Sequence, residues 1–149
     1  MIKDIIINKL KIIPDERGEI MHMMKKSDPH FSKFGEVYFA TAYPGVIKGW
    51  HLHKTQEQNY CVIQGMIKLV IYDPRKDSPT YNKIQEIFLG EKNYSIVKIP
   101  PGLVNGWKCI STKKAILANC SNEEHRPNEM ERIEPFSKSI PYDWNIVFK

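Results

Sequence analysis

Residues 45–65 read GVIKGWHLHKTQEQNYCVIQG, and the interpretation of the whole chain starts from this stretch. It begins and ends on a glycine and contains His51 and His53, separated by a single residue. In an extended strand, residues two apart share a face and lie about 6.6 Å apart. The spacing therefore predicts two imidazoles on one face of a β-strand.

Two imidazoles on one face can transfer protons or hold a metal ion. Glu57 follows shortly after His53 and adds a carboxylate that either chemistry can use. A lone histidine in a strand is usually structural or exposed, but a pair beside a carboxylate favours a functional site. Tyr60 and the apolar run after Gly65 are expected to form paired strands that close on the same face.

Short runs rich in β-branched and aromatic residues follow one another along the chain, separated by turn-forming residues. These runs are residues 5–13, 20–24, 35–42, 60–63, 66–72, 84–89, 94–99, 107–110 and 115–120. Gln64-Gly65 predicts a tight hairpin, and residues 27–33 predict one short helix with Pro29 in its first turn. About eight to ten strands and very little helix indicate one all-β domain over residues 1–149, a jelly-roll sandwich or barrel.

The composition is typical of a globular domain, with 42% hydrophobic and 26% charged residues. A chain of 149 residues is long enough to bury a core without disulfides or metals. No apolar run approaches the roughly 20 residues of a membrane-spanning helix. The first residues, Met1-Ile2-Lys3-Asp4, carry charge where a signal peptide is apolar. We therefore expect a cytoplasmic protein with no membrane partner.

Basic residues outnumber acidic ones, which gives a net charge of +5 and a pI near 9.0. They are scattered from Lys3 to Lys149, whereas nucleic-acid binders concentrate their charge on one face or module. We expect no nucleic-acid partner, since the excess suits a small anionic ligand such as a diphosphate. Three cysteines, Cys61, Cys109 and Cys120, lie in apolar runs without a CxxC spacing and are expected to be buried thiols in a reducing compartment.

Five short motifs follow one another along nearly the whole chain. They are DERG at residues 15–18, GVIKGWH at 45–51, DPRKDSPT at 73–80, IPPG at 99–102 with GW at 106–107, and IPYDW at 140–144. Each motif is weak by itself, but together they make the chain similar to the dTDP-4-dehydrorhamnose 3,5-epimerase family. That family is a branch of the cupin jelly rolls. Within that family, the chain most resembles short bacterial members from spore-coat and surface-polysaccharide clusters.

The resemblance implies an isomerase that acts on a nucleoside-diphosphate 4-keto-6-deoxy sugar. A base removes the proton next to the ketone, and an acid returns a proton to the other face of the enolate. The resemblance implies no cofactor and no metal. It also implies a homodimer that shares strands, in which each N-terminal segment helps to build the nucleotide site of the other subunit.

The resemblance also assigns roles to individual residues. His51 falls on the family's catalytic base, and Arg17 falls on an arginine that grips the diphosphate, for which a planar guanidinium is well suited. Lys48 stands where the family usually has a second arginine. The further expected substrate contacts are Glu36, Tyr38, Gln58, Asn105, Asn119 and His125.

Four family positions carry a different residue in this chain. The family's catalytic tyrosine aligns with Asn119, and the aspartate that orients the base aligns near Ser137. A pocket lysine becomes Gln58, and the histidine after Pro-Pro-Gly becomes Asn105. An amide cannot donate a proton at neutral pH as a phenol can. The identity of the proton donor is therefore open, with His53, Tyr38 and Tyr60 as candidates.

Three alternatives stay open beside the epimerase. The pair His51 and His53 also resembles that of the sugar 3,4-ketoisomerases, which shuttle a proton between adjacent carbons. A metal-binding cupin would use His51, His53 and Glu57 as ligands. A protein that binds a nucleotide sugar without turning it over would keep Arg17 and Lys48. The sequence leaves open which nucleotide sugar is bound and which carbons react.

Overall fold

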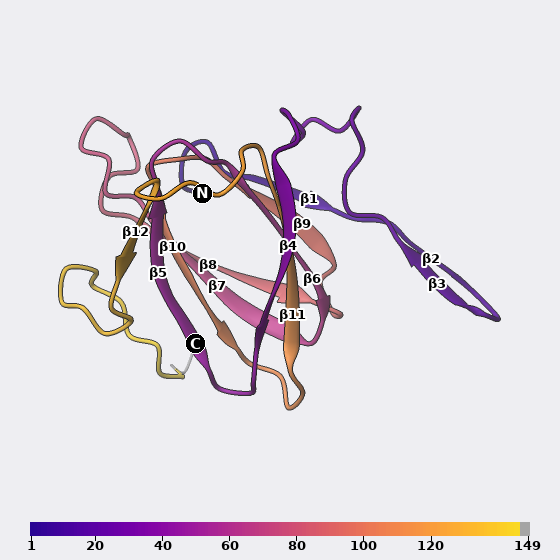
Figure 1. The fold of residues 1–149 in the computed structure, drawn as a ribbon. Coiled ribbons are helices and arrows are strands. Elements are labelled where there is room, and N and C mark those ends of the chain that lie inside the picture. The colour runs from indigo at the N-terminus through magenta and orange to yellow at the C-terminus, as the bar shows by residue number, and fades with distance from the viewer. Residues whose placement is uncertain (147–149) are drawn as a thin grey trace.

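Two five-stranded antiparallel sheets face each other in the computed structural model, which describes residues 1–146 (Figure 1). The first sheet has the order β1 (Ile6–Lys9), β9 (Ser95–Ile99), β6 (Gln58–Gln64), β11 (Ala115–Ser121) and β4 (Glu36–Ala42). The second has the order β12 (Met130–Ile133), β5 (Ile47–His53), β10 (Val104–Cys109), β7 (Met66–Tyr72) and β8 (Ile84–Gly90). This arrangement confirms the predicted all-β jelly roll.

A two-stranded hairpin of β2 (Ile12–Asp15) and β3 (Gly18–Met21) projects away from the two sheets (Figure 1). The predicted strand over residues 5–13 is thus divided into β1 and β2, which belong to different sheets. Pro14 lies within β2. This position is compatible with a proline because both strands of an isolated hairpin are edge strands, where a missing N–H does no harm.

The helix predicted over residues 27–33 is wrong, since residues 1–146 contain no helix and hence none able to cross a membrane. The segment forms successive turns instead. The carboxylate of Asp28 accepts a hydrogen bond from the backbone N–H of Lys25 at 2.6 Å, and the N–H of Phe31 donates to the Asp28 carbonyl at 3.0 Å. Two helical turns without a packed face are marginal in water, so local side-chain bonds decide the conformation.

The tight hairpin predicted at Gln64-Gly65 is also wrong, because β6 and β7 belong to opposite sheets. Gly65 has a φ of 75° and carries the chain across from one sheet to the other. A Cβ there would lie 2.7 Å from Ser111 Oγ, so the crossing is too tight for a side chain. The expected pairing of the Tyr60 strand with the run after Gly65 therefore does not occur.

The main core fills the space between the sheets with fully buried aliphatic side chains, among them Leu69, Ile71, Val97 and Leu117. A second apolar cluster covers the outer face of the second sheet. There the rings of Trp50 and Trp144 lie 4.9 Å apart, and both indole N–H groups donate to the carbonyl of Pro135. The C-terminal segment is thus fastened to the outside, and one end of the inter-sheet space stays open.

Candidate active site

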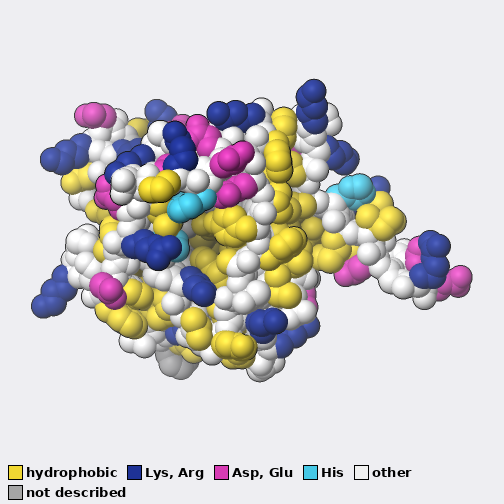
Figure 2. Space-filling view, in the orientation of Figure 1, with side chains coloured by type: hydrophobic (Ala, Val, Ile, Leu, Met, Phe, Trp, Pro, Cys, Tyr) yellow, Lys and Arg dark blue, Asp and Glu magenta, His cyan; other side chains and the backbone are white. Residues whose placement is uncertain are grey.

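A cavity of about 420 Å³ opens between the two sheets, and Figure 2 shows histidine and basic side chains around an apolar hollow on this face. The second sheet contributes side chains from β5, β10 and β12, and the first sheet contributes side chains from β4, β6 and β11. The lining residues are Glu36, Tyr38, Ala40, Lys48, His51, His53, Gln56, Tyr60, Trp107, Leu117, His125, Met130 and Arg132.

Strand β5 places both histidines in this cavity, as their spacing predicts. His51 is half-buried, lies opposite Arg132 of β12 on one side and is paired with Asn105 of β10 on the other. His53 is only 7% exposed and is paired with Met130. The same strand thus offers two imidazoles in different surroundings.

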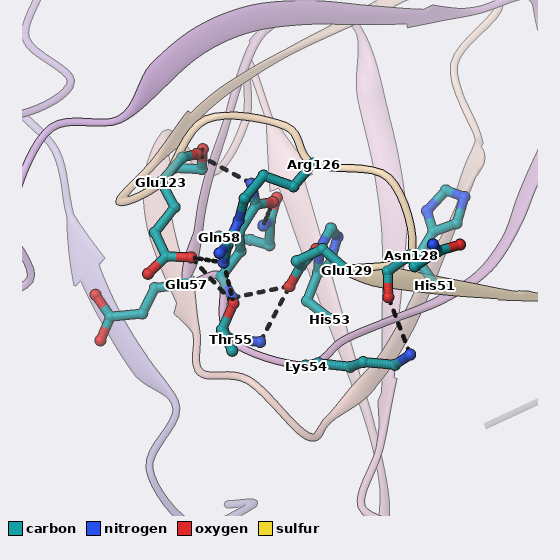
Figure 3. Close-up of polar contacts among 12 residues, drawn as sticks. His51, His53, Lys54, Thr55, Glu57, Gln58, Glu123, Arg126, Asn128 and Glu129 are labelled. Atoms are coloured by element: carbon teal, nitrogen blue, oxygen red, sulfur yellow. Dashed lines mark hydrogen bonds and ion pairs between the residues drawn. The ribbon is translucent and has the colours of Figure 1, made fainter.

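The imidazole of His53 contacts a buried carboxylate (Figure 3). Its Nδ1 lies 2.7 Å from Oε2 of Glu129, while Oε1 accepts hydrogen bonds from the backbone N–H groups of Thr55 and Gln56 at 3.0 and 2.9 Å. Burial acts to raise the pKa of Glu129, but these two backbone donors and His53 outweigh it and lower that pKa to about 2. The carboxylate is therefore ionised at neutral pH.

His51 lies among basic side chains. Burial lowers its pKa, and the neighbouring His53, Arg132 and Lys48 lower it further, to about 4. The ring is therefore neutral at pH 7 and has a nitrogen lone pair available to accept a proton.

Two tyrosines face the histidines from the other sheet. Tyr38 of β4 and Tyr60 of β6 lie on either side of Asn119 of β11 in the strand register. Burial raises the pKa of Tyr60, with a further contribution from Tyr38, and burial likewise raises the pKa of Tyr38, although a hydrogen bond with Asn119 acts against it. Both phenols are protonated at neutral pH and can donate a proton.

Two predicted substrate contacts form a buried chain of amides instead. The Nδ2 of Asn119 donates to Oε1 of Gln58, and the Nε2 of Gln58 donates to Oε1 of Gln56 at 3.2 Å. The Nε2 of Gln56 then donates to the carbonyls of Glu123 and Glu124 at 3.0 and 2.8 Å. Gln58 and Asn119 are 1% and 0% exposed and are not among the residues that line the cavity. Their amides hold the loop that leads to β12.

The other predicted site residues are placed as follows. Glu36, Lys48 and His125 line the cavity. Asn105 is buried and donates from Nδ2 to the His51 carbonyl at 3.5 Å, and its Oδ1 is buried without a hydrogen-bond partner. Arg17 lies outside the cavity, at the tip of the β2–β3 hairpin, where it pairs with Asp15 at 2.6 Å.

The position expected to orient His51 does not reach it. Ser137 lies in the segment after β12, and its hydroxyl lies 2.8 Å from the hydroxyl of Ser139. Ser137 is not part of the cavity lining.

The structure does not assemble the alternative metal site. The carboxylate of Glu57 pairs with Lys98 at 3.0 Å and accepts a hydrogen bond from Ser32, so it does not join His51 and His53. Among residues 1–146, no group of three or more histidine, cysteine, aspartate or glutamate side chains is placed to hold a metal ion. His51, His53 and Glu57 therefore do not come together as the expected set of metal ligands.

Sequence reasoning missed Glu129 and Arg132, which contact or approach the histidines. Both lie in a polar segment near the C-terminus for which the sequence predicts no strand, although residues 130–133 form β12. The pairing of β12 with β5 brings them to the site across nearly eighty positions of sequence. A search for a carboxylate partner for each histidine would have named Glu129 only as one of several glutamates.

The chain matches known proteins along its whole length. The family model described as dTDP-4-dehydrorhamnose 3,5-epimerase matches residues 1–149. A probable low-salt glycan biosynthesis epimerase of Haloferax volcanii is 31% identical over 95% of this chain and 89% of its own. A spore coat polysaccharide biosynthesis protein of Bacillus subtilis is 26% identical over the full length of both. The crystal structure of a dTDP sugar isomerase from Desulfovibrio desulfuricans G20 superposes with a TM-score of 0.94, at 35% identity over 96% of this chain and 92% of that one.

The burial and the cationic surroundings of His51 predict an unusually low titration midpoint. In an NMR titration, the His51 ring should titrate near pH 4, well below the midpoint near 6.5 of an ordinary histidine. Arg132→Gln should move the midpoint upward, because it removes a positive charge beside the ring. Lys54→Gln, which removes a charge paired with Glu131 away from the cavity, is the matched control. A midpoint near 6.5 in the unaltered protein would contradict this description of the site.

Proposed function

The chain belongs to the dTDP-4-dehydrorhamnose 3,5-epimerase family, and we propose that it epimerises a nucleoside-diphosphate 4-keto-6-deoxy sugar during the synthesis of a surface polysaccharide. The relatives from Haloferax and Bacillus carry names from glycan and spore-coat polysaccharide synthesis, which supports this pathway class. The observation that carries the proposal is the placement of histidines and tyrosines on opposite walls of one cavity.

The proposed reaction needs a base and an acid on opposite faces of the sugar. The ketone makes the neighbouring C–H acidic, and the lone pair of neutral His51 takes that proton, which leaves an enolate. A phenol of the facing sheet, Tyr60 with Tyr38 beside it, then gives a proton to the same carbon from the other side. The carbon is inverted and the ketone is restored. Only protons move, so the step requires no redox cofactor.

The charges around the cavity suit an anionic substrate. Lys48 and Arg132 line the wall next to His51 and offer positive charge to a diphosphate or to the enolate oxygen. Glu36 can accept hydrogen bonds from sugar hydroxyls, and the exposed ring of His125 at the rim can stack on a nucleotide base. Both walls of the cavity thus contribute to binding as well as to proton transfer.

Arg17 can serve such a site only from a second copy of the chain, so we propose a homodimer. The hairpin that carries it projects from the body (Figure 1), and its side chain is 85% exposed. An extended arm with a guanidinium at its tip fits the diphosphate of a neighbouring subunit's ligand. The free, buried thiols of Cys61, Cys109 and Cys120 are compatible with a reducing compartment, and we place the protein in the cytoplasm.

A sugar 3,4-ketoisomerase is the second candidate. His51 and His53 lie on the same wall, which suits a proton shuttle between adjacent carbons on one face of the sugar. The two reactions start from the same 4-keto nucleotide sugar and differ in the carbons that exchange protons and in the position of the final ketone. Exchange with solvent therefore separates them.

Proton exchange tests the proposed function directly. The protein, incubated with dTDP-4-keto-6-deoxyglucose in D₂O and followed by NMR, should introduce deuterium at C3 and C5 of the sugar. His51→Ala and Tyr60→Phe should each slow the exchange by at least about 100-fold without weakening nucleotide binding. His22→Ala, an exposed histidine outside the cavity, should leave the rate unchanged.

The other exchange patterns would decide against an epimerase. Deuterium at C3 alone together with a shifted ketone would identify the ketoisomerase. Tight binding without any exchange would identify a nucleotide-sugar-binding protein.

Subunit mixing tests the role proposed for Arg17. Arg17→Ala and His51→Ala should each be nearly inactive as pure proteins, because each alters every site of a homodimer. After the two variants are mixed and allowed to exchange subunits, one site per mixed dimer has both residues intact. Up to about a quarter of the parental activity should return for a 1:1 mixture, as binomial pairing dictates. Light scattering that reports a monomer, or a mixture without recovered activity, would contradict a shared site.

A further inference from the structure

Glu129 carries a buried charge that has no part in the reaction proposed above. The residue is 6% exposed and lies immediately before β12, where both of its carboxylate oxygens are engaged. Removing a carboxylate from water is costly even when hydrogen bonds compensate, and apolar side chains can replace many buried ion pairs without loss of stability. A buried charge in contact with a histidine that lines a cavity therefore calls for a role beyond packing.

The contacts of Glu129 determine which nitrogen of His53 carries a proton. An ionised carboxylate can only accept hydrogen bonds, and Oε2 of Glu129 lies 2.7 Å from Nδ1 of His53 (Figure 3). Nδ1 must therefore be the protonated nitrogen. Nε2 is then the nitrogen left for the cavity, which His53 lines. In a neutral ring this nitrogen carries the lone pair that accepts a proton.

The segment that holds Glu129 is itself firmly anchored. The N–H of Lys54 donates to the Glu129 carbonyl at 3.1 Å, which continues the pairing of β12 with β5. Upstream, Arg126 donates to the hydroxyl of Thr55 at 2.9 Å and pairs with Glu123 (Figure 3). A carboxylate held by the backbone at Thr55 and Gln56 has little freedom to turn away from the imidazole. Such supporting contacts orient functional histidines in enzymes.

The two imidazoles differ in their ionisable neighbours. The ionisable neighbours that shift the pKa of His51 are His53, Arg132 and Lys48, none of which is a carboxylate. The carboxylate of Glu129 contacts His53, although His51 is the residue that aligns with the family's catalytic base. Within residues 1–146, the ion pairs that involve a cavity histidine comprise only His53 with Glu129.

We infer that Glu129 is a positioning residue that fixes the tautomer of His53, so that Nε2 of His53 serves as a second proton acceptor beside His51. The inference rests on the proposed function, because it assigns His53 to the same cavity and the same keto sugar. The proton taken by Nε2 comes from a carbon next to the ketone and is returned to the sugar or to solvent. Glu129 keeps its negative charge and stabilises the imidazolium while it exists.

Glu129→Gln is the most informative variant because it preserves the shape of the side chain. The amide oxygen can still accept from the N–H groups of Thr55 and Gln56, and the amide nitrogen then faces Nδ1 of His53. An NH₂ group donates, so it selects the tautomer with the proton on Nε2 and the lone pair on the wrong nitrogen. In ¹H–¹⁵N spectra of the ligand-free protein, His53 should change from Nδ1-protonated to Nε2-protonated.

The same variant should lower the rate of deuterium exchange into dTDP-4-keto-6-deoxyglucose by about 10- to 100-fold, with kcat reduced and KM changed less than about twofold. Glu129→Asp, which retains the charge, should recover part of the rate and the original tautomer. Glu131→Gln is the matched control, since Glu131 lies on the same strand but outside the cavity and pairs with Lys54. It should change neither the tautomer nor the rate.

A His53 whose Nδ1 carries no proton in the unaltered protein would overturn the inference. So would a Glu129→Gln variant that is folded and retains the parental exchange rate. The tautomer is read without substrate, so it decides the positioning role even if the unaltered protein proves inactive toward this sugar. In that case the proposed function fails, while the measurement on His53 stands by itself.

Discussion

The carboxylate of Glu129 and its three hydrogen-bond donors hold the functional end of the molecule together. Its bonds to the backbone at Thr55 and Gln56 and to the ring of His53 tie the start of β12 to the end of β5. β12 is an edge strand of only four residues, and these bonds add to its pairing with β5. Met130 and Arg132 on that strand line the cavity, so the contacts of Glu129 help to set the shape and charge of the site.

The jelly roll solves a geometric problem of epimerisation, which needs a base and an acid on opposite faces of one carbon. Its two sheets present the histidines of β5 on one wall and the tyrosines of β4 and β6 on the other. The cations near His51, Lys48 and Arg132, affect its pKa differently without and with a bound ligand. Without ligand, burial and these cations together lower the pKa of His51 to about 4 and keep it neutral. When a diphosphate or an enolate brings negative charge, the same pKa rises, which favours proton uptake at the moment it is needed.

The features that depend on local spacing could be predicted from the sequence. Alternation along a strand places His51 and His53 in one cavity, and the succession of short apolar runs indicates the all-β fold. Features that depend on distant pairing could not be predicted. Gly65 looks like a hairpin turn, yet each flanking strand finds better partners in a different sheet. Gln58 and Asn119 align with family site positions, but they bond to each other because the pairing of the neighbouring strands β6 and β11 places both side chains on one face. Glu129 reaches His53 only through the pairing of β12.

A crystal structure with dTDP-rhamnose, a stable product analogue that lacks the ketone, would test the location of the reaction most directly. The sugar ring should lie between the sheets, with a carbon that flanks C4 about 3.5 Å from a ring nitrogen of His51 or His53 on one side. The phenol of Tyr60 should face the same ring from the other side. A sugar bound instead in the outer hollow beside Lys68 and Trp144, or turned away from both histidines, would contradict the assignment of the active site.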